Sequence, residues 1–221
     1  MESSPKSQEW KKFSLSEHEG NQYLVEEDEI EETNFLAACF FTSRVLNMEA
    51  IACTFKLLWR TRKGFEVRDM GNHRVLFEFK DSGAVDRVLK GEPWSFDKNL
   101  VALKQVSKHT DVRNLNFDRT SFWVQVHNLP IGSFSMAVAK EIALVAGVID
   151  GEETAMGDGE GCNFLRVQIA INPTNLLCRG RKNFKYKRPP NICYWCGRLT
   201  HHDNNCPSRL KKRGVALEDE K

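Results

Sequence analysis

The chain has 221 residues, of which 41% are hydrophobic and 28% charged, which suits one or two modest cores and excludes a large catalytic assembly. Its net charge of +2 alone would argue against a strongly basic nucleic-acid-binding protein. The charge is unevenly spread, since residues 1–34 hold 10 acidic and 3 basic side chains, whereas residues 178–214 hold 11 basic and 1 acidic. We therefore expect an acidic arm and a basic tail that faces a polyanion.

The N-terminal arm, residues 1–34, lacks sustained hydrophobic periodicity, and its acidic run Glu26–Glu32 repels itself in a compact form. We predict a mobile arm, with a docked helix around Trp10 and Phe13 as the alternative. The sequence shows no secretion signal and no apolar run long enough for a membrane span, so we expect an intracellular protein. Its seven cysteines should then be reduced, and clustered cysteines predict a metal site before a disulfide.

Residues 35–106 predict a ferredoxin-like domain. The expected elements are a buried strand at 35–45, a helix from Met48 to Trp59, a hairpin of strands 65–70 and 73–80, a short helix after Asp81 and a strand at about 99–106. Periodicity alone does not exclude a helix at 35–45. Asn47 and Asp81 are candidate N-caps, and Gly91 is expected to end the second helix in a left-handed conformation. The order β-α-β-β-α-β is that of the α+β, RNA-recognition-motif-like fold.

Residues 120–172 predict a partial second α+β unit. Alternating residues predict a strand that ends at Asn128-Leu129-Pro130 and another at 164–171, with a helix of about 135–146 between them. We interpret the acidic, glycine-rich stretch Gly151–Gly161 as a flexible loop. The sequence leaves open whether these elements form their own sheet or extend the first one.

The basic region 178–214 contains the strongest motif, C-x2-C-x4-H-x4-C at residues 193–206. Three thiolates and one imidazole suit tetrahedral Zn²⁺, and a closed site of this kind is structural rather than catalytic. So short a segment would need the metal in order to fold. The predicted ligands are Cys193, Cys196, His201 and Cys206, with the neighbouring His202 as the alternative imidazole.

This segment resembles the CCHC zinc knuckle of retroviral nucleocapsid proteins and retroelement Gag-like proteins. The resemblance implies that Tyr194, after the first cysteine, stacks on an unpaired base. Gly197 keeps one of the two glycines usual in that family, but Thr200 occupies the place of the other. For Trp195, packing against the preceding strand and base stacking are both open.

Basic residues on both sides of the knuckle, interleaved with Phe184 and Tyr186, predict binding to single-stranded RNA or DNA. Lys211-Lys212-Arg213 also fits part of a nuclear-import signal, so we favour the nucleus over the cytoplasm. The predicted nucleic-acid-binding residues are Tyr194, Trp195, Arg181, Lys182, Lys185, Lys187, Arg188, Arg198, Lys211, Lys212 and Arg213.

Over roughly residues 9–207 the chain also resembles a plant family in which a domain of unknown function precedes a CX2CX4HX4C knuckle, in proteins derived from LINE-type retrotransposons. The matching segments are 9–16, 64–71, 91–97, 122–130, 164–167 and 184–188. Family members usually have one more strand before the last of these, so a sheet edge is expected to be missing here. The resemblance implies zinc and nucleic-acid binding, and the family's defining domain has no established chemistry.

The first domain is not expected to bind RNA through its sheet. Arg74 and Leu76 fall where RNA-recognition motifs place stacking aromatics, and Phe77 and Phe79 are expected in the core. No phosphate loop or nucleophile pattern indicates an enzyme. The sequence thus predicts a zinc-dependent nucleic-acid-binding protein; the alternative is a protein-interaction or self-association adaptor whose knuckle is only structural. A further hypothesis is that the acidic arm competes with nucleic acid for the basic tail.

Overall fold

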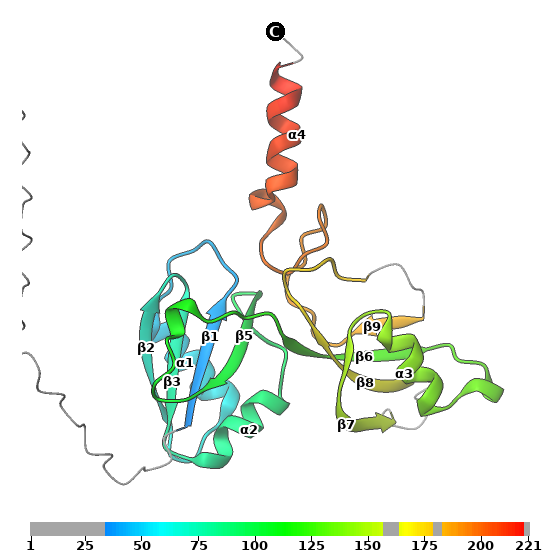
Figure 1. Ribbon diagram of the computed structural model, residues 1–221, viewed down its shortest axis with the longest axis horizontal. Coiled ribbons are helices and arrows are strands. Elements are labelled where there is room, and N and C mark those ends of the chain that lie inside the picture. The colour runs from blue at the N-terminus through cyan, green and yellow to red at the C-terminus, as the bar shows by residue number, and fades with distance from the viewer. Residues whose placement is uncertain (1–33, 157–163, 179–182, 219–221) are drawn as a thin grey trace, which may run out of the picture. The chain divides into compact units, whose positions relative to one another are not determined.

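A computed structural model describes residues 34–156, 164–178 and 183–218 (Figure 1). The acidic arm, part of the predicted loop 151–161, and Arg181 and Lys182 lie outside the described residues. The strands are β1 (Asn34–Phe40), β2 (Phe65–Gly71), β3 (Arg74–Phe79), β4 (Trp94–Phe96), β5 (Asn99–Val106), β6 (Thr120–His127), β7 (Val148–Met156), β8 (Phe164–Ile171) and β9 (Phe184–Tyr186). The helices are α1 (Met48–Trp59), α2 (Ser82–Lys90), α3 (Met136–Leu144) and α4 (Pro207–Glu218), with 3-10 turns at Val112–Asn114, Ile131–Ser133 and Asp203–Asn205.

The first sheet has the strand order β2-β3-β1-β5-β4, and all of its pairings are antiparallel. The predicted buried strand is β1, which lies between β3 and β5 and ends at Phe40, earlier than expected. Alternate residues of β1, β3 and β5 pack against α1 and α2. Phe77 and Phe79 are fully buried in this core, as predicted. The protein therefore combines helices with antiparallel sheets in the expected element order, with β4 as an addition.

The helix caps follow the sequence prediction only in part. Asn47 caps α1, because its side-chain oxygen accepts a hydrogen bond of 3.0 Å from the backbone N–H of Ala50. Asp81 occupies the N-cap position of α2, but its carboxylate pairs with Arg87 at 2.9 Å and caps no backbone N–H. The ion pair with Arg87 therefore replaces the predicted N-cap hydrogen bond of Asp81.

Gly91 does not end α2 in the predicted left-handed conformation, since its φ is −80°. Space requires the glycine instead: a Cβ there would lie 2.6 Å from Cζ2 of Trp94. The Trp94 indole is fixed in this place by its N–H, which donates to the carbonyl of Val88 at 2.7 Å. The close contact with Trp94, and not a left-handed backbone conformation, explains why residue 91 is a glycine.

The face of the first sheet opposite its helices is covered by the chain that follows β5. Ala37, Leu76 and Ala102 on this face pack against the buried side chains of Val112 and Phe117. Polar groups at its margin are also engaged: Arg74 donates to the carbonyl of Leu115, and Lys104 to the carbonyl of Asn116, each at 3.4 Å. The surface that RNA-recognition motifs expose is therefore buried here.

The second sheet has the strand order β7-β8-β6-β9, so these elements form their own sheet and do not extend the first. The prediction of a loop at 151–161 is wrong for Gly151–Met156, which belongs to β7. β9, which is part of the matching segment 184–188 itself, pairs with β6 and forms one edge of this sheet; residues 179–182, just before it, lie outside the described residues. Helix α3 contacts this sheet and contributes Ala139 and Ala143 to its core. Within the described ranges, no helix is long and apolar enough to cross a membrane.

Candidate metal centre and nucleic-acid interface

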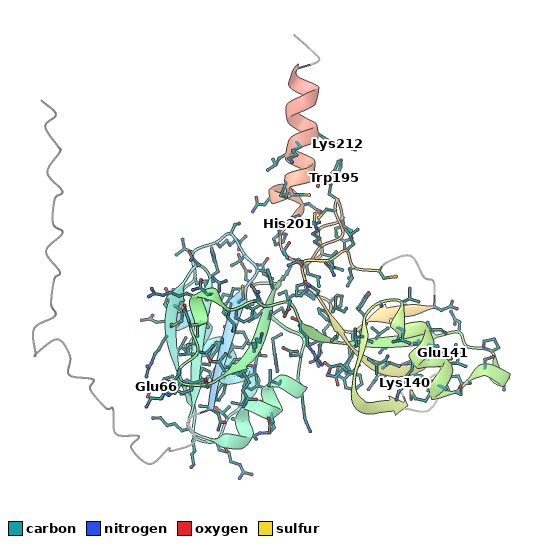
Figure 2. The ribbon with its side chains drawn as sticks, in the orientation of Figure 1. Glu66, Lys140, Glu141, Trp195, His201 and Lys212 are labelled. Carbon is teal, nitrogen blue, oxygen red and sulfur yellow. The ribbon has the colours of Figure 1, made fainter. Side chains whose placement is uncertain are left out.

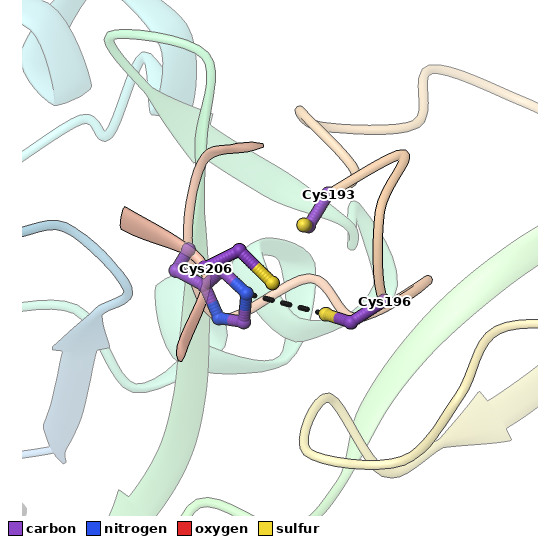
Figure 3. A group of neighbouring side chains, drawn as sticks. Cys193, Cys196 and Cys206 are labelled. Atoms are coloured by element: carbon purple, nitrogen blue, oxygen red, sulfur yellow. Dashed lines mark hydrogen bonds between the residues drawn. The ribbon is translucent and has the colours of Figure 1, made fainter. Parts of the chain in front are cut away.

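The four predicted metal ligands meet in one cluster. The three Sγ atoms of Cys193, Cys196 and Cys206 and a ring nitrogen of His201 all lie within 4.8 Å of one another (Figure 3). Sulfurs on a tetrahedral zinc ion are about 3.7 Å apart, as follows from a Zn–S distance of about 2.3 Å. The two outer cysteines of the motif are buried, and the other two residues are half-buried. The donor set and its spacing fit Zn²⁺.

The turn between the first two cysteines is held by its backbone. The N–H of Gly197 donates to the carbonyl of Cys193 at 2.7 Å, and the N–H of Cys193 donates to the carbonyl of Arg198 at 2.9 Å. Gly197 has a φ of 76°, a conformation that favours glycine. The sequence analysis missed Asp203, whose carboxylate accepts the N–H of Tyr194 at 2.6 Å and closes the turn from the other side.

The two adjacent histidines, His201 and His202, have different hydrogen-bond partners. Nε2 of His201 lies 3.2 Å from Sγ of Cys196, the contact dashed in Figure 3, while its Nδ1 lies 3.0 Å from the Thr200 hydroxyl. The ring of His202 points elsewhere, with Nε2 3.1 Å from the Asn191 side-chain amide. Thr200, which replaces a usual glycine, thus contacts the nitrogen that a metal would leave free.

Burial and local hydrogen bonds shift two of the thiols in opposite directions. Burial raises the pKa of Cys193 to about 12. Burial acts the same way on Cys206, but backbone N–H groups at the start of α4, chiefly that of Arg209, and the His201 ring outweigh it and lower the pKa of Cys206 to about 6.

The knuckle is attached to the second sheet. Leu199 is only 2% exposed and packs in the core of that sheet, next to Leu177 and Ile192. The N–H of Leu177 donates to the carbonyl of Gly197 at 2.9 Å. These contacts connect the knuckle to the core of the second sheet.

Two aromatic rings of the knuckle face solvent. Tyr194 is 78% exposed and Trp195 is 51% exposed. The ammonium of Lys212, on α4, lies 5.6 Å from the centroid of the Trp195 ring, and Figure 2 shows the two side chains together beside the knuckle. Of the two interpretations of Trp195, burial against the preceding strand does not describe this half-exposed ring.

The predicted basic residues separate into two groups. Arg198, Lys211 and Lys212 are exposed on the knuckle and α4, whereas Lys185 lies in β9 with Lys187 and Arg188 directly after it. Arg181 and Lys182 are outside the described residues, as is the side chain of Arg213. The interleaved Tyr186 is a core residue: its ring packs against Phe122, and its hydroxyl donates to the carbonyl of Cys178 at 3.0 Å.

Two protein-family models match separate segments of this chain. Residues 30–114 match the domain of unknown function DUF4283, and residues 182–208 match the family described as a zinc knuckle. The two matches fall on separate parts of the chain. This confirms the predicted pairing of a domain of unknown function with a zinc knuckle.

Similarity to individual proteins covers only part of the chain. An uncharacterized protein of Arabidopsis thaliana is 29% identical over 136 residues, which cover 55% of this chain and 42% of that protein. The chain thus spans less than half of that relative. A solved chain, from a structure titled for interdomain RRM packing in an RNA 3′ processing ternary complex, covers 62% of this chain and 81% of itself, with 11% identity and a TM-score of 0.30. So low a score carries no argument about fold or function.

Proposed function

We propose that this protein binds single-stranded nucleic acid through a zinc-dependent CCHC knuckle. The observation that carries the proposal is the gathering of Cys193, Cys196, His201 and Cys206 within 4.8 Å, beside exposed rings and cations. Zn²⁺ would supply the free energy that orders the loop, and four protein ligands would leave no position for a catalytic water. We accordingly propose a binding role and no enzymatic one.

The chemistry beside the cluster supports a polyanionic, base-bearing ligand. Tyr194 and Trp195 offer ring faces for unpaired bases, and Lys212 stands where it would neutralise the phosphate next to a stacked base. The first domain supplies a ferredoxin-like fold whose usual RNA-binding face is covered, so we place the ligand on the C-terminal half. We attribute the knuckle to a retroelement Gag-like ancestor on its spacing, and its reduced thiols suit an intracellular site, in the nucleus or the cytoplasm.

The test is a fluorescence-anisotropy titration of the full chain with labelled single-stranded RNA and DNA, with and without a zinc chelator, over a salt series. We expect the chelator to abolish binding. The affinity should fall with salt with a logarithmic slope of about −2, because each of three phosphate contacts, by Arg198, Lys211 and Lys212, contributes about −0.7. Binding that ignores both zinc and salt would refute the proposal. No binding, together with zinc-dependent self-association, would support the adaptor alternative instead.

A further inference from the structure

The second sheet has one buried face and one face open to solvent. Along β6 and β8, buried residues alternate strictly with half-buried ones from Phe122 and Phe164 onward. The buried set packs in the core with α3. The half-buried set lies on the opposite face and consists of Trp123, Gln125 and His127 from β6 and Phe164, Arg166, Gln168 and Ala170 from β8.

The strand register arranges these side chains, with two from β9, in a compact grid. Across β6 and β8 the opposing pairs are Trp123 with Gln168, Gln125 with Arg166, and His127 with Phe164. On the other side of β6, Lys185 is paired with Gln125. Lys187 lies next to Trp123, because its N–H donates to the Trp123 carbonyl at 2.8 Å. We call these eight residues the open face.

The composition of the open face is unusual for a solvated sheet. It carries three aromatic rings and three cations, and none of the eight side chains is acidic. The rings of His127 and Phe164 lie 5.0 Å apart, and the guanidinium of Arg166 lies over the Phe164 ring at 5.3 Å. Burial and the charge of Lys185 lower the pKa of His127. A sheet face that contacts only water needs polar side chains, but it has no need of aromatic rings.

A cavity of about 180 Å³ adjoins the open face at Trp123. Its lining includes three basic residues, Lys90, Lys187 and Arg188, around the Trp123 indole, together with one acidic residue, Glu92. This volume is about that of six water molecules, enough for one phosphate group or one base. One carboxylate oxygen of Glu92 accepts the backbone N–H of Ser121, and the nearby Asp150 pairs with Arg119.

We propose that the open face and its adjoining cavity form a second binding surface for single-stranded nucleic acid. The inference rests on the proposed function, since the same strand would continue from the knuckle. The excess of basic over acidic residues favours a polyanion over an ordinary protein partner, and the interspersed rings favour unpaired bases. Only residues 189–192 separate Arg188 from Cys193, so the two surfaces are adjacent along the chain. The first sheet offers no equivalent, because residues 112–117 cover its corresponding face.

The test compares short and long labelled single strands, of about 6 and about 20 nucleotides, bound to the full zinc-loaded chain. The variant K185A/K187A should bind the short strand as the wild type does. It should bind the long strand at least about fivefold more weakly, with a salt slope shallower by about 1.4, because two phosphate contacts are lost. Lys140→Ala, on α3 and thus on the side of the sheet that the helix covers (Figure 2), is the matched control and should bind both strands normally.

A second variant tests the indole. Trp123→Ala should weaken the affinity for the long strand alone by about fivefold or more. Trp123→Phe should retain most of that affinity, because base stacking needs an aromatic ring. Zinc content and circular dichroism check that each variant is folded. Wild-type affinity of K185A/K187A for the long strand would overturn the inference, while zinc-dependent binding of the short strand would leave the proposed function intact. If the wild type bound neither strand, the proposed function itself would fail.

Discussion

Replacing Glu92 with glutamine is expected to make the stability of the protein less dependent on pH. Glu92 is 5% exposed, and one carboxylate oxygen accepts the backbone N–H of Ser121 at 2.8 Å. The other oxygen is buried and has no hydrogen-bond partner. Burial raises the pKa of Glu92 to about 7; hydrogen bonds from Ser121 oppose the shift, and the charge of Asp150 adds to it.

The sign and size of the effect follow from linkage. A carboxyl whose pKa rises from 4.5 to about 7 on folding favours the folded state fully below pH 4.5. This stability is lost as the pH rises through 7, and it amounts to about 3 kcal/mol at about 1.4 kcal/mol per unit. Glutamine keeps the acceptor for Ser121 but never ionises. The stability of Glu92→Gln relative to the wild type should therefore increase by about 3 kcal/mol between pH 4.5 and pH 8.

The assay is urea unfolding of wild type and variant at several pH values, with zinc in all samples. Effects of pH on the metal cluster are common to both proteins and cancel in the difference. Glu141→Gln, an exposed position on α3 (Figure 2), is the control and should show a flat difference. A difference between Glu92→Gln and wild type that does not change with pH would refute the reasoning.

Three further substitutions test the site and the fold. Tyr194→Ala should weaken single-strand binding about fivefold or more and leave the zinc content unchanged, as titration and metal analysis will show. His201→Ala should lose tight zinc binding, whereas His202→Ala should keep it, in a chelator competition. Gly91→Ala should cost about 1–3 kcal/mol in urea unfolding, because the new Cβ meets the Trp94 ring.

Each of these expectations has a clear contrary result. Unchanged affinity of the Tyr194 variant would reject base stacking by that ring. Equal zinc affinities of the two histidine variants would reject the assignment of His201 as the ligand. Wild-type stability of the Gly91 variant would mean that the Trp94 indole moves aside without cost. Glycine at 132, where a Cβ would meet nothing within 4 Å, provides the matched control as Gly132→Ala.

The sequence predicted those parts of the fold in which local pattern and tertiary packing agree. The boundaries of β5 and β8 were predicted closely; β8 alternates strictly between buried and half-buried residues, and β5 begins with a continuous buried run. β7 was missed since its second half, Gly151–Met156, has a loop-like composition and owes its conformation to pairing with β8. The covering of the first sheet by residues 112–117 is a long-range contact that no local pattern encodes.

The same distinction applies to the metal centre. Ligand types and gaps are local, so C-x2-C-x4-H-x4-C was enough to find residues that the fold brings together. The roles of Thr200 and Asp203 depend on how the loop closes in three dimensions, and spacing does not reveal them. The basic residues before the knuckle were predicted as part of a tail, but strand pairing places Lys185 within a sheet.

Because Leu199 is buried in the core of the second sheet, the knuckle packs against that sheet and differs from an independent domain on a flexible linker. If the contact through Leu199 holds the knuckle against the sheet that contains β9, a strand that enters over Tyr194 and leaves over β9 would have a fixed polarity. Metal loss would likewise loosen the core around Leu177, so zinc occupancy and sheet stability should be thermodynamically coupled. Transplanting residues 193–206 onto another protein would carry over the metal site without this directionality.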